Sequence, residues 1–176
     1  LNAAVGFGIN IALSAVTAGM QPKFSIRGTI QGGGEVPRTF PIGLVCDAGL
    51  LVYHNTWGKP NGTPNAYFTQ VIALADVPCG ALQNLYVNGE KVTIEWDNLD
   101  GDFGYTITEY RKKGRDHLWV KWYDGTQIIA DPLLTTKVSS VARPWQSTRV
   151  GKGIAYAVVT ARISAKLYSG LPTYKF

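Results

Sequence analysis

Short apolar runs recur along this chain about every ten residues, separated by glycine, proline and asparagine. Runs of this length predict β-strands rather than helices. The expected strands are Phe24–Ile30, Thr39–Cys46, Leu50–His54, Tyr67–Ala75, Tyr105–Tyr110, Leu118–Tyr123 and Ile154–Ile163. The pattern therefore predicts a mainly β fold of barrel or sandwich type with little helix.

The strongest local prediction is a hairpin within Leu85–Glu95. Asn88-Gly89 suits a two-residue type I′ turn, which needs positive φ at both positions. After the turn, Val92, Ile94 and Trp96 alternate with polar residues. We expect those three side chains on a buried face and their neighbours in water.

The first 22 residues carry no charged side chain. We expect residues 1–22 to be an uncharged apolar segment, with an N-terminal apolar helix over Ile9–Ala18, before a β-rich domain over 23–176. The segment lacks the basic start of a secretory signal and is interrupted by Gly6 and Gly8. It either packs on protein or enters a membrane. A further domain boundary is placed near 97–104, where the chain is acidic and contains glycine.

Few residues are charged, 16%, while aromatic residues reach 11%. This composition favours a subunit that buries surface against neighbours. The net charge is +5, and its densest cluster is Arg111–Arg115, at an expected hairpin tip. That tip is either a solvated loop or a phosphate contact.

The sequence offers no recognisable catalytic or metal-binding pattern. His54 and His117 are its two histidines, and no Gly-x-Ser-x-Gly turn is present. Cys46 and Cys79 do not have the spacing of metal ligands. We expect them to be core or turn residues, and the alternative is a disulfide bond between them. We therefore expect no enzyme, no metal and no cofactor.

The chain contains aspartate and glutamate residues, but their spacing matches neither a calcium-binding loop nor a known catalytic motif. Asp97, Asp100 and Asp102 do not follow the spacing of an EF-hand calcium loop. Glu95, Asp97, Glu109 and Asp124 are candidates for a glycosidase pair by residue type alone. We expect an ordinary acidic loop over 97–104.

Large aromatic side chains are the candidate packing and interface residues. They are Trp57, Tyr67, Trp119, Trp122, Trp145 and Tyr156. Core or subunit contact is the main interpretation, and a sugar-stacking platform is the alternative. Trp119 and Trp122 have opposite parity on one expected strand, so they should face different sides.

The order of several short motifs resembles the N-terminal hub region of phage tail-tip or baseplate hub proteins, the host-specificity, central-fibre type. Relatives of that family occur in prophages and gene-transfer agents. The motifs run from about residue 24 to the end of the chain. They are Gly33–Gly43, Gly49–Tyr53, Thr63–Asp76, Leu85–Glu90, Trp119–Gln127, Arg143–Trp145, Gly151–Thr160 and Gly170–Pro172.

The resemblance implies a structural role in a virion. The family's hub is a homotrimer of β-rich domains, a ring joining tail tube to fibre and gating genome delivery and host attachment. Implied partners are the chain itself, distal tail and tube proteins, the tape-measure protein and fibre components. The host receptor would be met indirectly, and DNA only as passing cargo. The alternative is a receptor- or carbohydrate-binding β module. Because the last apolar run is unfinished, we expect a piece of a longer polypeptide.

Overall fold

The structure is a computed structural model that describes residues 7–12, 25–30, 40–164, 167–168 and 170–176, with side chains from residue 40 onward. The described part is mainly β, as the sequence predicted, and its sheets are antiparallel. Within it, no helix is long and apolar enough to cross a membrane.

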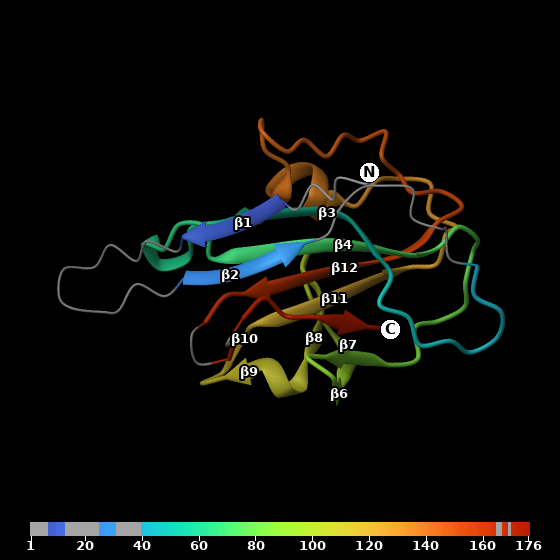
Figure 1. The fold of residues 1–176 in the computed structure, drawn as a ribbon, viewed down its shortest axis with the longest axis horizontal. Coiled ribbons are helices and arrows are strands. Elements are labelled where there is room, and N and C mark those ends of the chain that lie inside the picture. Colours follow the sequence, from blue (N-terminus) through green and yellow to red (C-terminus); the bar gives the residue numbers. More distant parts are fainter. Residues whose placement is uncertain (1–6, 13–24, 31–39, 165–166, 169) are drawn as a thin grey trace, which may run out of the picture.

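A six-stranded sheet forms the body of the molecule (Figure 1). Its strands, in spatial order, are β3 (Leu50–Trp57), β4 (Tyr67–Ala75), β12 (Ala155–Arg162), β11 (Leu118–Tyr123), β8 (Gly104–Ile107) and β7 (Ile94–Asp100). β4 and β12 lie in the middle and are buried on both faces. Most of their side chains are apolar, and the polar Thr69, Gln70 and Thr160 are buried among them, because neither face meets water.

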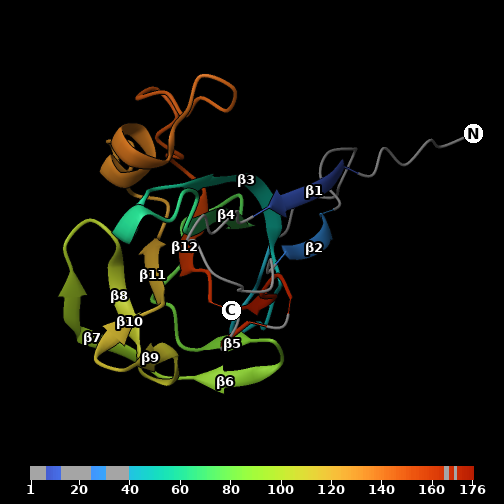
Figure 2. The same ribbon diagram turned by 90° about the vertical axis from the view of Figure 1, so that its left-hand side faces the viewer.

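A three-stranded sheet faces the large one. It consists of β13 (Tyr174–Lys175), β5 (Leu85–Val87) and β6 (Glu90–Val92). Figure 2 shows the large sheet curling around the C-terminal segment, with β5 and β6 across its open side. The large sheet has β3 and β7 at its two edges, so the barrel is not closed.

The remaining elements are short. Two hairpins form separate two-stranded sheets, β1 (Phe7–Ala12) with β2 (Ser25–Ile30), and β9 (Arg111–Lys112) with β10 (Arg115–Asp116). Three single helical turns are η1 (Pro60–Gly62), η2 (Thr108–Tyr110) and η3 (Leu134–Val138).

The large sheet has apolar clusters on both faces, because side chains alternate along each strand. One cluster joins it to the small sheet and the C-terminal segment, through residues such as Phe68, Leu85 and Tyr168. The other lies under η3, where Leu134 and Val138 meet Tyr53 and Val158. A single sheet therefore holds the small sheet on one side and η3 on the other.

Two predicted elements are wrong. The helix expected over Ile9–Ala18 is contradicted at Ile9–Ala12, which belong to β1 and pair with β2; residues 13–18 lie outside the described part. Phe7, Ile9 and Ile11 alternate with smaller residues, which is a strand period. The strand expected over Thr39–Cys46 is a loop where the structure describes it, from Phe40 on, with a bend at Gly43 and Leu44.

The predicted alternation after Asn88-Gly89 holds only in part. The turn itself is confirmed, with φ of 54° at Asn88 and 89° at Gly89. Val92 is buried, but Trp96 is 46% exposed. The chain leaves the small sheet after Val92 and joins the large one at Ile94, and a bulge after Glu95 shifts the register. Residues 97–104, near which a domain boundary was placed, form the end and turn of the β7–β8 hairpin.

Candidate interaction surface

The segment Phe40–Cys46, here called the apolar segment, exposes large hydrophobic side chains in close succession. Phe40 is 66% exposed, Ile42 82% and Leu44 84%. Pro41 has no N–H to offer a neighbouring strand. Within the described structure the backbone of 40–46 makes no hydrogen bond. The segment is therefore apolar, makes no hydrogen bond with described residues, and bends at Gly43, whose φ is 77°.

The apolar segment is tied to the molecule just after it ends. The N–H of Asp47 donates to the carbonyl of Phe176 at 3.0 Å, and the N–H of Phe176 donates back at 2.8 Å. The Asp47 carboxylate also accepts from the N–H of Gly49 at 3.1 Å through Oδ1. These contacts fix where the segment leaves the core.

A groove of about 650 Å³ lies beside the apolar segment. Its apolar lining comes from Leu44, Val45, Leu74, Leu82, Trp122 and Phe176. The loop Cys79–Asn84 also lines the groove, and the indole of Trp122 donates to the carbonyl of Gly80 at 3.0 Å. One polar atom stands out: Oδ2 of Asp47 is buried and has no hydrogen-bond partner in the described structure.

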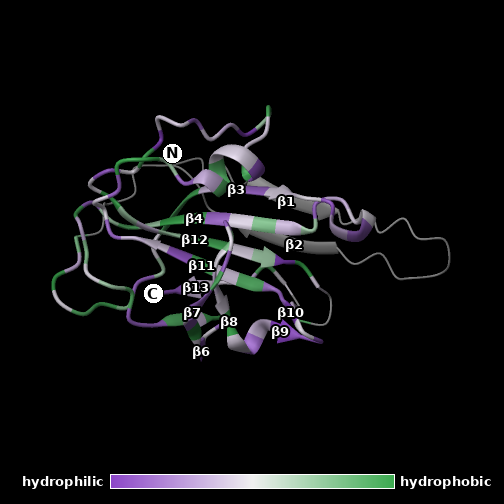
Figure 3. Ribbon diagram, turned by 180° about the vertical axis from the view of Figure 1, so that it is seen from behind, coloured by the Kyte–Doolittle hydropathy of each residue, from purple (hydrophilic) through white to green (hydrophobic). Residues whose placement is uncertain are grey.

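A second hollow adjoins the groove. It has a volume of about 520 Å³, shares Trp122 and residues 79–81 with the groove, and reaches Thr126 and Gln127. Next along the chain, Ile128 and Ile129 are 75% and 69% exposed. In Figure 1 the apolar segment runs through the cyan loop on the right, and loops at the corresponding left end of Figure 3 carry hydrophobic stretches.

Both cysteines line the groove as free thiols. Cys46 is exposed and Cys79 is partly buried. The backbone N–H of Cys79 donates to the carbonyl of Asp124 at 2.8 Å, which fixes the loop that carries it. The thiol of Cys46 is thus a natural reporter of whether the groove is covered.

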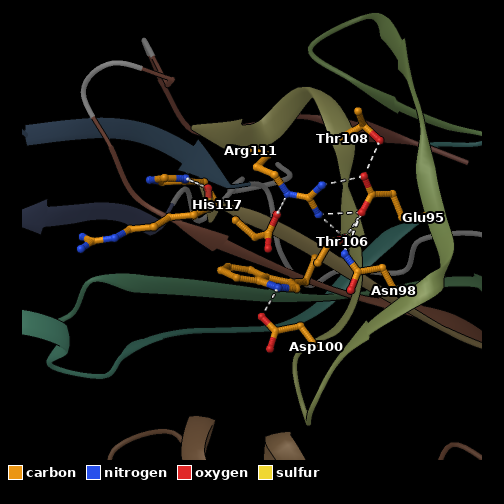
Figure 4. Close-up of polar contacts among 10 residues, drawn as sticks. Glu95, Asn98, Asp100, Thr106, Thr108, Arg111 and His117 are labelled. Carbon is orange, nitrogen blue, oxygen red and sulfur yellow. Dashed lines mark hydrogen bonds and ion pairs between the residues drawn. The ribbon is translucent and has the colours of Figure 1, made fainter. Parts of the chain in front are cut away.

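Polar side chains gather at the other end of the large sheet, around Glu95 and Arg111 (Figure 4). The Arg111 guanidinium donates to both Glu95 oxygens, at 3.0 and 2.6 Å, and its Nε donates to Asp116 at 2.7 Å. Three further side chains donate to the same carboxylate: Asn98, Thr106 and Thr108. Arg111 and these donors lower the pKa of Glu95 to about 2.

This cluster joins β7 and β8 to the β9–β10 hairpin. Because Glu95 is fully engaged and ionised, its role is to hold the strands together. The basic tip beyond it is solvated: Lys112, Lys113 and Arg115 are exposed and make no ion pair with a described residue.

Both histidines make contacts within the chain. His54 lies against Arg143, with Nδ1 2.6 Å from the guanidinium, and burial together with that charge lowers its pKa to about 4. His117 contacts the carbonyl of Arg115 at 2.9 Å, and burial lowers its pKa as well. Both rings are therefore neutral near pH 7.

A buried carboxylate, Asp131, was missed by the sequence analysis. Its Oδ2 accepts from Lys121 at 2.9 Å and from the hydroxyl of Tyr123 at 2.6 Å. Its Oδ1 accepts from the N–H of Leu134, the first residue of η3, at 2.9 Å. The signal was present as Asp131-Pro132, because aspartate before proline is typical of a helix start. The carboxylate anchors η3 to β11.

The six predicted aromatic residues are distributed over both faces of the large sheet. Trp119 and Tyr156 are buried, while Trp57, Tyr67, Trp122 and Trp145 are partly buried. Trp122 lines the groove. Trp119 lies on the face of β11 opposite to Trp122, as the parity of these two residues predicted, and it contacts Tyr67 there. A sugar platform built from Trp119 and Trp122 is thus excluded by geometry.

The others pack within the chain. Trp57 contacts Tyr67 with ring centroids 4.8 Å apart, Tyr156 stacks on Tyr123 at 4.6 Å, and Trp145 meets Tyr53 at 5.0 Å. These contacts account for intrachain packing. Their contribution to an interface between subunits stays a prediction.

Among the described residues, no group of three or more histidine, cysteine or carboxylate side chains could hold a metal ion. Asp100 accepts from the Trp119 indole at 2.8 Å and Asp102 pairs with Lys137 at 3.2 Å. Comparison of the chain with protein-family models, curated proteins and solved structures finds no match.

Proposed function

We propose that this chain is a structural subunit of a phage-like tail tip, part of a hub ring that links tail tube to fibre and gates genome delivery and host attachment. The observation that carries the assembly role is the apolar segment with its groove. A side chain such as Leu44, 84% exposed among other exposed apolar residues, is costly in water unless a partner covers it.

The polar chemistry of the described residues supports the same proposal. Glu95, Asp131 and Arg111 are all engaged in contacts that join one element to another. Their arrangement stabilises a scaffold. The motif resemblance supports a tail-tip hub as the scaffold, and the exposed apolar surface supports its assembly with a partner.

In this proposal the partners are other copies of the chain, as a homotrimer, together with tail tube, tape-measure and fibre proteins. The place of action is the virion tail tip. DNA passes through the ring, and the receptor is met through the fibre.

The test is the mass of the purified chain in solution, by light scattering after size exclusion, over a hundredfold range of concentration. We expect a trimer at the upper end and rings in electron micrographs. A monomer throughout, both for this chain and for any longer parent chain, would overturn the proposal. A monomer that binds oligosaccharides on a glycan array would replace it with the carbohydrate-binding alternative.

A further inference from the structure

We propose that the face formed by the apolar segment, its groove and Ile128–Ile129 is the contact with a second copy of this chain. The inference rests on the proposed function and adds the surface through which assembly occurs. In the contact, the exposed side chains of Phe40–Cys46 pack on the neighbouring copy, and an apolar side chain of that copy enters the groove.

The exposed area on this face matches what such a contact needs. Six large apolar side chains lie on it: Phe40, Ile42, Leu44, Val45, Ile128 and Ile129. Together they expose several hundred Å², on the order of the roughly 800 Å² that one partner contributes to a stable interface. Isolated exposed apolar residues are ordinary, but four within Phe40–Val45 are not.

The backbone of the apolar segment is the second argument. From Phe40 to Cys46 it makes no hydrogen bond within the described structure, and it bends at Gly43, where φ is 77°. Its N–H and C=O groups on either side of the bend are therefore open to a neighbouring copy. The adjoining Asp47–Phe176 pair fixes the end of the segment against the core, so the segment is held at this face.

Charge and polarity favour a copy of this chain over a polyanion. The residues lining the two hollows include no lysine or arginine, and Asp47 and Asp124 are their carboxylates. Such a lining does not suit phosphate groups, but lets two copies meet with little like-charge repulsion. The unpartnered Oδ2 of Asp47 would accept from an N–H or hydroxyl of the neighbouring copy.

Hydrogen exchange read by mass spectrometry on the full chain tests the contact directly. At low concentration, where the chain is monomeric, the amides of 40–46 should exchange as in an open chain. In the oligomer their exchange should slow by about tenfold or more. Alkylation of Cys46 by a maleimide should slow in parallel, because its exposed thiol lies at the groove.

Two lysine variants, one on the proposed contact and one away from it, test whether this surface mediates association. Leu44→Lys places a charge in the centre of the proposed contact and should weaken association about a hundredfold. Val141→Lys is the matched control: Val141 is fully exposed, lies outside the groove lining, and should leave association unchanged. Thermal unfolding of the Leu44→Lys monomer should match wild type, since Leu44 is 84% exposed.

The outcomes distinguish this inference from the proposed function. An oligomer in which 40–46 exchanges freely, or which Leu44→Lys leaves intact, overturns the proposed surface but keeps the assembly role. A chain that stays monomeric under all conditions overturns both. An oligomer protected at 40–46 and disrupted by Leu44→Lys alone supports the inference.

Discussion

Two buried tyrosines near the C-terminus differ in one hydrogen bond. The Tyr168 hydroxyl donates to the carbonyl of His117 at 2.7 Å. The Tyr174 hydroxyl is buried and has no partner in the described structure. Burial raises the pKa of both, so each keeps its proton at any ordinary pH. One hydroxyl therefore contributes a bond and the other only a desolvation cost.

Replacing each tyrosine by phenylalanine should give opposite results. Tyr168→Phe should lower the free energy of unfolding by about 1 kcal/mol, because a buried bond is lost. Tyr174→Phe should leave it unchanged or raise it by up to about 1 kcal/mol, because an unsatisfied hydroxyl is removed. Urea denaturation of the two variants measures both values. Equal losses would show that the Tyr174 hydroxyl has a partner.

The contribution of Glu95 to stability should depend on pH. Its pKa falls from 4.5 to about 2 in the folded chain, chiefly through Arg111. A depressed carboxyl pKa contributes stability that is fully present above pH 4.5 and is lost as the pH falls toward 2. In Glu95→Gln, the melting temperature should therefore decline less between pH 4.5 and 2 than in wild type.

The control for that experiment is Glu90→Gln. Glu90 is exposed and makes no side-chain hydrogen bond with a described residue. Melting temperatures by circular dichroism should follow the wild-type pH profile. If Glu95→Gln follows it too, the contacts around Glu95 do not persist in solution.

At the scale of elements, two glycines with positive φ serve different purposes, one in a local turn and one in the packing of two strands. Gly89 and Gly104 both have positive φ, 89° and 110°. A Cβ on Gly89 would meet open space, so the hairpin turn is a local matter. A Cβ on Gly104 would lie 2.6 Å from the carbonyl oxygen of Val120 on β11, so that glycine serves the packing of two strands.

Alanine at the two positions should therefore differ in cost. Gly89→Ala should destabilise by about 1 kcal/mol, from backbone strain alone. Gly104→Ala should cost about 2 kcal/mol more, because strand β8 must move away from β11. Chemical denaturation of both variants gives the comparison. Similar costs would mean that β8 can shift without loss.

On the scale of the whole molecule, one apolar cluster joins the two sheets. Leu85 on β5 is fully buried in it with Val120 of β11 and Val159 of β12. The five tryptophans lie outside the small sheet, at positions 57, 96, 119, 122 and 145. Their fluorescence therefore reports on the large sheet and its surroundings.

A cavity created in the small sheet should also lower the stability of the large sheet. Leu85→Ala should lower the free energy of unfolding seen by tryptophan fluorescence by about 2–5 kcal/mol. Leu99→Ala is the control, because Leu99 is 60% exposed and should cost less than about 1 kcal/mol. An unchanged fluorescence transition in Leu85→Ala would show that the sheets unfold independently.

The sequence by itself determined the features that depend on neighbouring residues. Asn88-Gly89 specified its turn because few residue pairs accept positive φ twice. The continuous apolar run of β4 specified a central strand, and the opposite parity of Trp119 and Trp122 specified opposite faces.

Only the tertiary structure decided features that depend on a distant partner. Phe40–Cys46 has the composition of a strand, yet no described strand lies beside it, and a strand exists only when another chain segment completes its hydrogen bonds. Likewise, β6 and β7 follow each other in the chain, yet each pairs within a different sheet. Asp131 joins two elements because Lys121 and Tyr123, on β11, donate hydrogen bonds to it. Local backbone preference acts between adjacent residues, whereas pairing and burial act between residues far apart in the chain.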